Sequence, residues 1–169
     1  MLLTLGDFEL AATEVLGAAN AAFVSGAAGE GRTRDANVAA FDALRLLPKV
    51  LVDVSDRSTK TSVLGHEIDL PVILAPSAMH RISHPDGERA TARAAHAAGT
   101  IMVLSLGSSL PVEEVLAAAS GPVWFQAYVG KDRGRTAEVA HRAHAAGCSG
   151  LVVTVDAPVM GGLVAQRRN

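Results

Sequence analysis

Residues 101–128 read IMVLSLGSSLPVEEVLAAASGPVWFQAY and contain the clearest structural signal in the chain. Ile101–Leu104 and Val123–Phe125 are short continuous apolar runs, as expected for strands of a parallel sheet that are buried on both faces. Between them, Pro111 opens a helical pattern and Gly121–Pro122 ends it. Strand, helix and strand in this order predict a right-handed βαβ unit.

The same alternation continues on both sides of this unit. An apolar run at Val72–Ala75 precedes a helical pattern over 87–98, which Gly99 closes. A second helical pattern, over about 135–146, precedes a run at Leu151–Val153. We therefore predict an α/β fold with about four βα units and a parallel sheet.

Residues 1–70 have a different pattern from the rest of the chain. Four elements are expected there: helices over 8–23 and 34–44, a short strand at Val50–Val52, and a small hairpin over 61–68 around Gly65-His66. We therefore divide the chain into an N-terminal helical extension with a hairpin, 1–70, and an α/β domain, 71–169.

Composition excludes several classes of protein. The chain has 169 residues, of which 49% are hydrophobic and 19% charged, so it can bury a core and is not disordered. A net charge of −2 gives no electrostatic reason to expect nucleic acid or an anionic membrane as partner. One cysteine excludes an internal disulfide framework and favours a reducing compartment. Neither a membrane-length apolar run nor a signal-peptide pattern occurs, so we expect a cytoplasmic protein.

Polar side chains follow each of the four apolar runs. They are Ser77, Ser105, Gln126, Tyr128, Thr154 and Asp156. In parallel α/β folds, ligands bind at the carboxyl ends of the strands. Polar loops follow strands in any protein, so one such residue indicates little. Four strand ends together predict a site for one planar ligand with a polar edge.

Other chemical motifs are weaker. Neither the glycine pattern of a dinucleotide site nor that of a P-loop occurs. His141 and His144 lie one helical turn apart with no third metal ligand nearby, which favours surface residues. His80 and His84 lie in the loop after the first run and could contact a ligand, but a structural role is favoured. Cys148 falls at the opposite end of the strands, where packing is expected.

Six segments resemble one known family, in the same order along the chain. They are LAPSAM (74–79), HPDGERATARAA (84–95), AGTIMVLS (98–105), WFQAY (124–128), KDR (131–133) and LVVTVDAP (151–158). The chain is similar to the FMN-dependent 2-hydroxy-acid oxidases and dehydrogenases, the group of glycolate oxidase and of lactate and mandelate dehydrogenases. The resemblance implies the N-terminal part of a TIM (β/α)8 barrel, with FMN across the carboxyl ends of the strands.

The same resemblance implies which residues bind the cofactor. Six would contact FMN, three at the centre of the isoalloxazine ring and three at its pyrimidine edge: Pro76, Ser77 and Ala78, and Ser105, Gln126 and Thr154. Four of these six residues are also strand-end residues by the apolar runs: Ser77, Ser105, Gln126 and Thr154.

The implied reaction is oxidation of a small 2-hydroxy acid to a 2-oxo acid. In the family a histidine takes the proton of the substrate hydroxyl while hydride passes from the α-carbon to flavin N5. Tyr128 would face the substrate, and Asp156 would pair with that histidine. The resemblance places the histidine and a carboxylate-binding arginine in the second half of the barrel, which this sequence does not contain.

The length of the chain indicates a half-barrel, and two departures from the family pattern indicate an alternative function. A (β/α)8 barrel needs about 250 residues, so 71–169 would form a half-barrel with open sheet edges. We expect it to associate with itself or with a complementary half-barrel chain. Ala22 replaces a tyrosine and Leu163 an arginine that bind substrate in the family. A non-catalytic remnant or interaction subunit is therefore the alternative, and a module for another planar ligand a third hypothesis.

Overall fold

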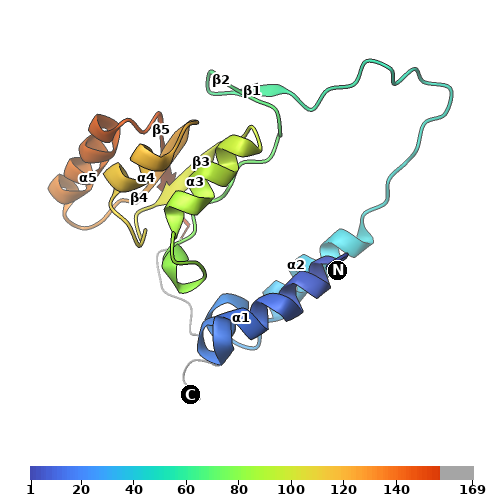
Figure 1. The fold of residues 1–169 in the computed structure, drawn as a ribbon, viewed down its shortest axis with the longest axis horizontal. Coiled ribbons are helices and arrows are strands. Elements are labelled where there is room, and N and C mark those ends of the chain that lie inside the picture. The colour runs from blue at the N-terminus through green and yellow to red at the C-terminus, as the bar shows by residue number, and fades with distance from the viewer. Residues whose placement is uncertain (157–169) are drawn as a thin grey trace. The chain divides into compact units, whose positions relative to one another are not determined.

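A computed structural model describes residues 1–156, in two compact units that comprise 1–56 and 57–156. The first unit contains the two expected helices, α1 (Leu5–Ser25) and α2 (Arg32–Ala43) (Figure 1). A reciprocal capping box starts α1: Asp7 N–H donates to the Thr4 hydroxyl at 3.2 Å, and the Asp7 carboxylate accepts from Thr4 N–H at 2.9 Å.

The strand predicted at Val50–Val52 is wrong. No element forms there, and Leu51 has a φ of 60°, which is incompatible with an extended strand. All three side chains are exposed, and no segment within residues 1–156 pairs with this backbone. An apolar run becomes a strand only where a partner accepts its backbone hydrogen bonds.

The predicted hairpin over 61–68 forms, but its turn is Leu64-Gly65 and not Gly65-His66, because His66 pairs with Val63 as the first residue of the second strand. Strands β1 (Thr61–Val63) and β2 (His66–Ile68) pair in antiparallel register around a two-residue turn. Both turn residues, Leu64 and Gly65, have positive φ, as a type I′ turn requires. The hairpin lies in the second unit, where Asp69 N–H donates to the Gly99 carbonyl at 2.8 Å.

The second unit is an α/β structure with a parallel sheet, as predicted. Its strands follow in the order β3 (Met102–Ser105), β4 (Val123–Tyr128) and β5 (Gly150–Thr154). Helices precede, connect and cover them: the short η1 (His80–Ile82), α3 (Glu88–Ala97), α4 (Val112–Ala118) and α5 (Arg133–Ala146) (Figure 1).

The strand predicted at Val72–Ala75 is reduced to a single parallel bridge between Leu74 and Met102. Leu74 N–H donates to the Ile101 carbonyl, and Val103 N–H donates to the Leu74 carbonyl, both at 3.0 Å. The segment thus runs beside β3 but is too short to extend the ladder. Pro71 and Pro76 flank it and cannot donate to a neighbouring strand.

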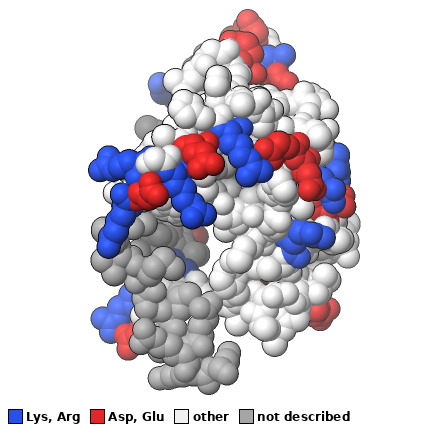
Figure 2. Space-filling view, turned by 90° about the vertical axis from the view of Figure 1, so that its left-hand side faces the viewer, with Lys and Arg blue, Asp and Glu red and all other residues white. Residues whose placement is uncertain are grey.

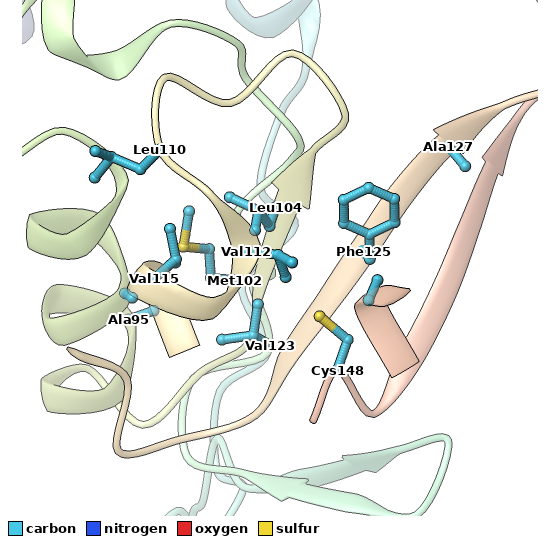
Figure 3. Packing of buried hydrophobic residues seen from close by; sticks show 12 residues of the cluster. Ala95, Met102, Leu104, Leu110, Val112, Val115, Val123, Phe125, Ala127 and Cys148 are labelled. Carbon is cyan, nitrogen blue, oxygen red and sulfur yellow. The ribbon is translucent and has the colours of Figure 1, made fainter. Parts of the chain in front are cut away.

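Side chains of the sheet alternate between two apolar clusters. On the helix-covered face, Met102, Leu104, Val123 and Phe125 pack with residues of α3, α4 and α5. Figure 3 shows the Cys148 thiol between Val123 and Phe125. On the other face, the buried side chains are those of Ile68, Ile101, Val103 and Trp124. Burial of these two clusters is what holds the carboxyl ends of the strands in place.

The Cys148 thiol lies in the helix-covered core, away from the carboxyl ends of the strands, as predicted. Burial raises its pKa from 9.0 to about 11. We expect a disulfide reagent at pH 8 to label the folded protein roughly 100-fold more slowly than the unfolded chain, because far less thiolate is present. Labelling at similar rates in both states would contradict this burial. The raised pKa also means that the free energy of unfolding falls as pH rises from 9 toward 11, because the unfolded chain releases the thiol proton first.

Charged side chains on the helices form exposed ion pairs. Arg142 on α5 lies 2.7 Å from Glu113 on α4, and Arg89 on α3 lies 3.8 Å from Glu114. Figure 2 shows basic and acidic side chains interleaved on the face in view. Such pairs contribute little to stability. Among residues 1–156, no helix has the length and apolar character needed to cross a bilayer.

Candidate active site

Three of the predicted residues form one hydrogen-bonded row across the carboxyl ends of β3, β4 and β5. The Ser105 hydroxyl donates to Gln126 Oε1 at 3.3 Å, and Gln126 Nε2 donates to Thr154 Oγ1 at 2.9 Å. Ser105 and Gln126 lie directly opposite each other in the ladder, and Thr154 lies two residues beyond the partner of Gln126. Parallel register therefore brings together residues that are 21 to 28 positions apart in sequence.

The amide of Gln126 has a fixed orientation. Its side chain is 1% exposed, and Oε1 also accepts the Leu106 N–H at 3.2 Å. A backbone N–H can only donate, so the Gln126 atom that accepts it is the amide oxygen, which leaves Nε2 as the donor toward Thr154. The row thus fixes one amide between two hydroxyl groups at the carboxyl ends of the strands, where the Thr154 side chain is half-buried.

The second predicted group, Pro76, Ser77 and Ala78, lies in the loop after Leu74 and is exposed. Met79 N–H donates to the Gly107 carbonyl at 3.1 Å, so this loop is attached to the loop after β3. A Cβ placed on Gly107 would lie only 3.0 Å from the Ala78 Cβ. The two loops are therefore in close contact beside the hydrogen-bonded row.

Tyr128 and Asp156 lie at the carboxyl ends of the strands and are more exposed than the polar row; Tyr128 is the last residue of β4, which extends beyond the predicted run at Val123–Phe125. Tyr128 ends β4 opposite Thr154 and is 48% exposed. Strand alternation places it on the same face of the sheet as Gln126. Asp156 is exposed just after β5. Of the two departures, Ala22 lies on α1 in the first unit, and Leu163 lies outside the described residues.

The two histidines of the loop after Leu74 have structural partners. His80 Nδ1 is hydrogen-bonded to Thr91 Oγ1 of α3 at 2.9 Å, and His84 Nδ1 accepts the Asp86 N–H at 3.2 Å. The structural interpretation of both residues is therefore the better one.

Sequence reasoning missed Glu88, the first residue of α3. Its side chain is 0% exposed, and Oε1 accepts the N–H groups of His80 and Ser109 and the Ser109 hydroxyl. Burial alone would raise the pKa of Glu88, but these donors outweigh it and hold the pKa below its usual value. Acidic residues are common in first turns and are mostly exposed, so no pattern in the sequence distinguishes this one.

Residues 12–169 match the family model of FMN-dependent dehydrogenases. The chain belongs to this family. It is 41% identical to 2-hydroxyacid oxidase 2 of Mus musculus over 99% of its length, and 45% identical to L-lactate oxidase of Nostoc sp. over 95%. The match covers 48% and 45% of those proteins, so the chain spans about half the length of the curated relatives it matches.

Solved structures agree with this assignment. A crystal structure of mandelate oxidase with (S)-2-phenylpropionate superposes with a TM-score of 0.94 and 37% identity, covering all of this chain and 50% of that one. The α/β fold of the chain is therefore that of the N-terminal half of its family. The family depends on FMN, and the polar row at the strand ends fits the edge of its ring system.

Proposed function

We propose that this chain is the flavin-binding half of an enzyme that oxidises a small 2-hydroxy acid to a 2-oxo acid with FMN. The observation that carries the proposal is the row of Ser105, Gln126 and Thr154, because it presents fixed hydrogen-bonding groups where a parallel barrel binds ligands. Family membership supports the cofactor, and relatives named 2-hydroxyacid oxidase and L-lactate oxidase support the substrate class.

Two groups of residues would hold FMN. Ser105, Gln126 and Thr154 would bind the pyrimidine edge, with the Gln126 amide N–H facing a ring acceptor. Pro76, Ser77 and Ala78 would contact the centre of the ring from the adjoining loop. The close packing of Gly107 on Ala78 supports this arrangement, because it holds that loop beside the row.

Two further residues would act on the substrate. Tyr128, at the open end of β4, would hydrogen-bond the substrate, and Asp156 would orient the catalytic histidine and stabilise its protonated form. When bound, FMN supplies the hydride acceptor. The chain's own residues would thus position the substrate and support the proton transfer.

The exposed edge of β5 supports an association partner for this half. We propose that 71–169 forms about four βα units of a (β/α)8 barrel behind the extension 1–70. Within residues 1–156, β5 pairs only with β4, and its side chains Leu151 and Val153 are 54% and 43% exposed. An unpaired strand edge with apolar side chains favours association. The partner would be a complementary half-barrel or a second copy.

We propose that the protein works in the cytoplasm, because a single cysteine suits a reducing compartment. A relative in Arabidopsis thaliana carries the name peroxisomal (S)-2-hydroxyacid oxidase, so fluorescence microscopy of the tagged protein should test both sites.

Reconstitution tests the proposed function. This chain would be co-folded with the C-terminal half of the mouse 2-hydroxyacid oxidase 2, the part that the match leaves uncovered. We call the product the reconstituted protein. We expect the two chains to elute together and to retain FMN, seen as visible flavin absorbance, after gel filtration. Co-elution without retained flavin would count against a flavin site and favour the non-catalytic alternative.

A further inference from the structure

The Glu88 carboxylate is buried between two loops of the candidate site. Its Oε1 accepts the His80 N–H at 3.1 Å, the Ser109 N–H at 2.7 Å and the Ser109 hydroxyl at 3.1 Å. His80 belongs to the loop after Leu74, and Ser109 belongs to the loop after β3. One carboxylate oxygen therefore joins two segments that are remote in sequence.

Further hydrogen bonds extend this connection. The Ser109 hydroxyl, which donates to Glu88, also accepts the Arg81 N–H at 3.1 Å. The imidazole of His80 is bonded to Thr91, one turn along α3 from Glu88. Glu88 is thus the centre of a small network that holds residues 80–81 against the start of the helix.

Backbone geometry shows that these loops are under constraint. Met79 has φ 55° and ψ 47°, a left-handed conformation that is unfavourable for a residue with a side chain. Such a conformation persists only where the surroundings fix it. Here Met79 N–H is bound by Gly107, and the next N–H, that of His80, is bound by Glu88. The strained residue directly follows the proposed flavin contacts at 76–78.

Net stability is a poor explanation for this carboxylate. Glu88 Oε2 is buried and has no hydrogen-bond partner within the described part of the chain. Burying a carboxylate is costly even when it is well paired, and an unpaired oxygen adds to the cost. The burial of Glu88 is better explained by its role in positioning the loop after Leu74 against the loop after β3.

We propose that Glu88 is a positioning residue that fixes the loop 76–82 to the loop 105–109 and so sets the spacing between the two groups of FMN contacts. The consequence for FMN rests on the proposed function, whereas the coupling of the loops does not. The test therefore has one arm without flavin and one arm with it.

Hydrogen exchange of the full chain without flavin tests the coupling. In Glu88→Ala we expect the amides of 79–82 and 106–109 to exchange at least about tenfold faster, while those of β4 remain unchanged. Glu88→Gln keeps an acceptor oxygen and should stay within about threefold of the parent. The control is Glu113→Ala, which removes an exposed carboxylate of α4. Unchanged loops, or equally faster exchange in β4, would overturn the proposal.

A milder variant keeps the test informative if Glu88→Ala does not fold. Ser109→Ala removes the hydroxyl that links Glu88 to Arg81. We expect faster exchange of about threefold, confined to the same two loops. Exchange equal to the parent in these loops would overturn the network.

FMN titration of the reconstituted protein tests the consequence. We expect Glu88→Ala to weaken FMN binding at least about tenfold, Glu88→Gln to restore most of it, and Glu113→Ala to have no effect. Faster exchange of the two loops in Glu88→Ala with unchanged FMN affinity would overturn the positioning role. If the loops exchange faster in Glu88→Ala but the parent protein binds no FMN, the proposed function is refuted and the loop coupling still holds.

Discussion

Replacing Gln126 with leucine is expected to weaken FMN binding to the reconstituted protein about 100-fold. Leucine has a similar volume but no hydrogen-bonding group. The substitution removes the amide N–H proposed to contact FMN and leaves the Leu106 N–H without its acceptor. Fluorescence-quenching titration with FMN measures the effect.

Ser105→Ala is the graded comparison for this prediction. It removes the 3.3 Å hydrogen bond to Gln126 and the hydroxyl that accepts the Gly107 N–H at 3.1 Å, but it leaves the bond between Gln126 and Thr154 in place. We expect a loss of about fivefold. If Gln126→Leu folds and binds FMN as tightly as the parent, the polar row is not the flavin site.

Gly150→Val is expected to destabilise the protein by about 3 kcal/mol, through overpacking of a buried contact. A Cβ on Gly150 would lie 2.6 Å from Trp124 Cδ1 and 2.7 Å from Cγ. The indole cannot move away easily, because Trp124 is buried against Ile101 and Val103. Urea denaturation followed by circular dichroism measures the free energy of unfolding.

Gly130→Ala is the matched control in the same unit. Its added Cβ would meet only the Thr136 hydroxyl, at 3.7 Å, which is an ordinary contact. We expect a change below about 0.5 kcal/mol. If Gly150→Val is equally mild, β5 does not pack against Trp124 as described.

Short apolar runs in the sequence predicted the strands β3, β4 and β5. The runs at β3, β4 and β5 are continuous and apolar. Those at β3 and β4 are buried between helices and the opposite cluster, whereas in β5 only Val152 packs against a cluster and Leu151 and Val153 are exposed. The runs at Val50–Val52 and Val72–Ala75 look the same in sequence, yet one has no paired strand and the other has a single bridge. Apolar content reports a tendency to be buried, whereas a ladder depends on a partner elsewhere in the chain.

Some residues of the candidate site could likewise be predicted from the sequence, and one could not. Ser105, Gln126 and Thr154 could be predicted because parallel strands align their carboxyl ends, whatever the details of packing. Glu88 could not, because its role arises only when the loops after Leu74 and β3 fold back over the start of α3. Neither periodicity nor spacing reports that contact.

Anaerobic addition of 2-hydroxy acids to the FMN-loaded reconstituted protein tests the central claim most directly. We predict that at least one of glycolate, L-lactate and mandelate bleaches the visible flavin absorbance, with one 2-oxo acid formed per flavin reduced. The corresponding 2-oxo acids should cause no bleaching. Tightly bound flavin that none of these substrates reduces would contradict the account and indicate a protein that binds FMN without oxidising 2-hydroxy acids.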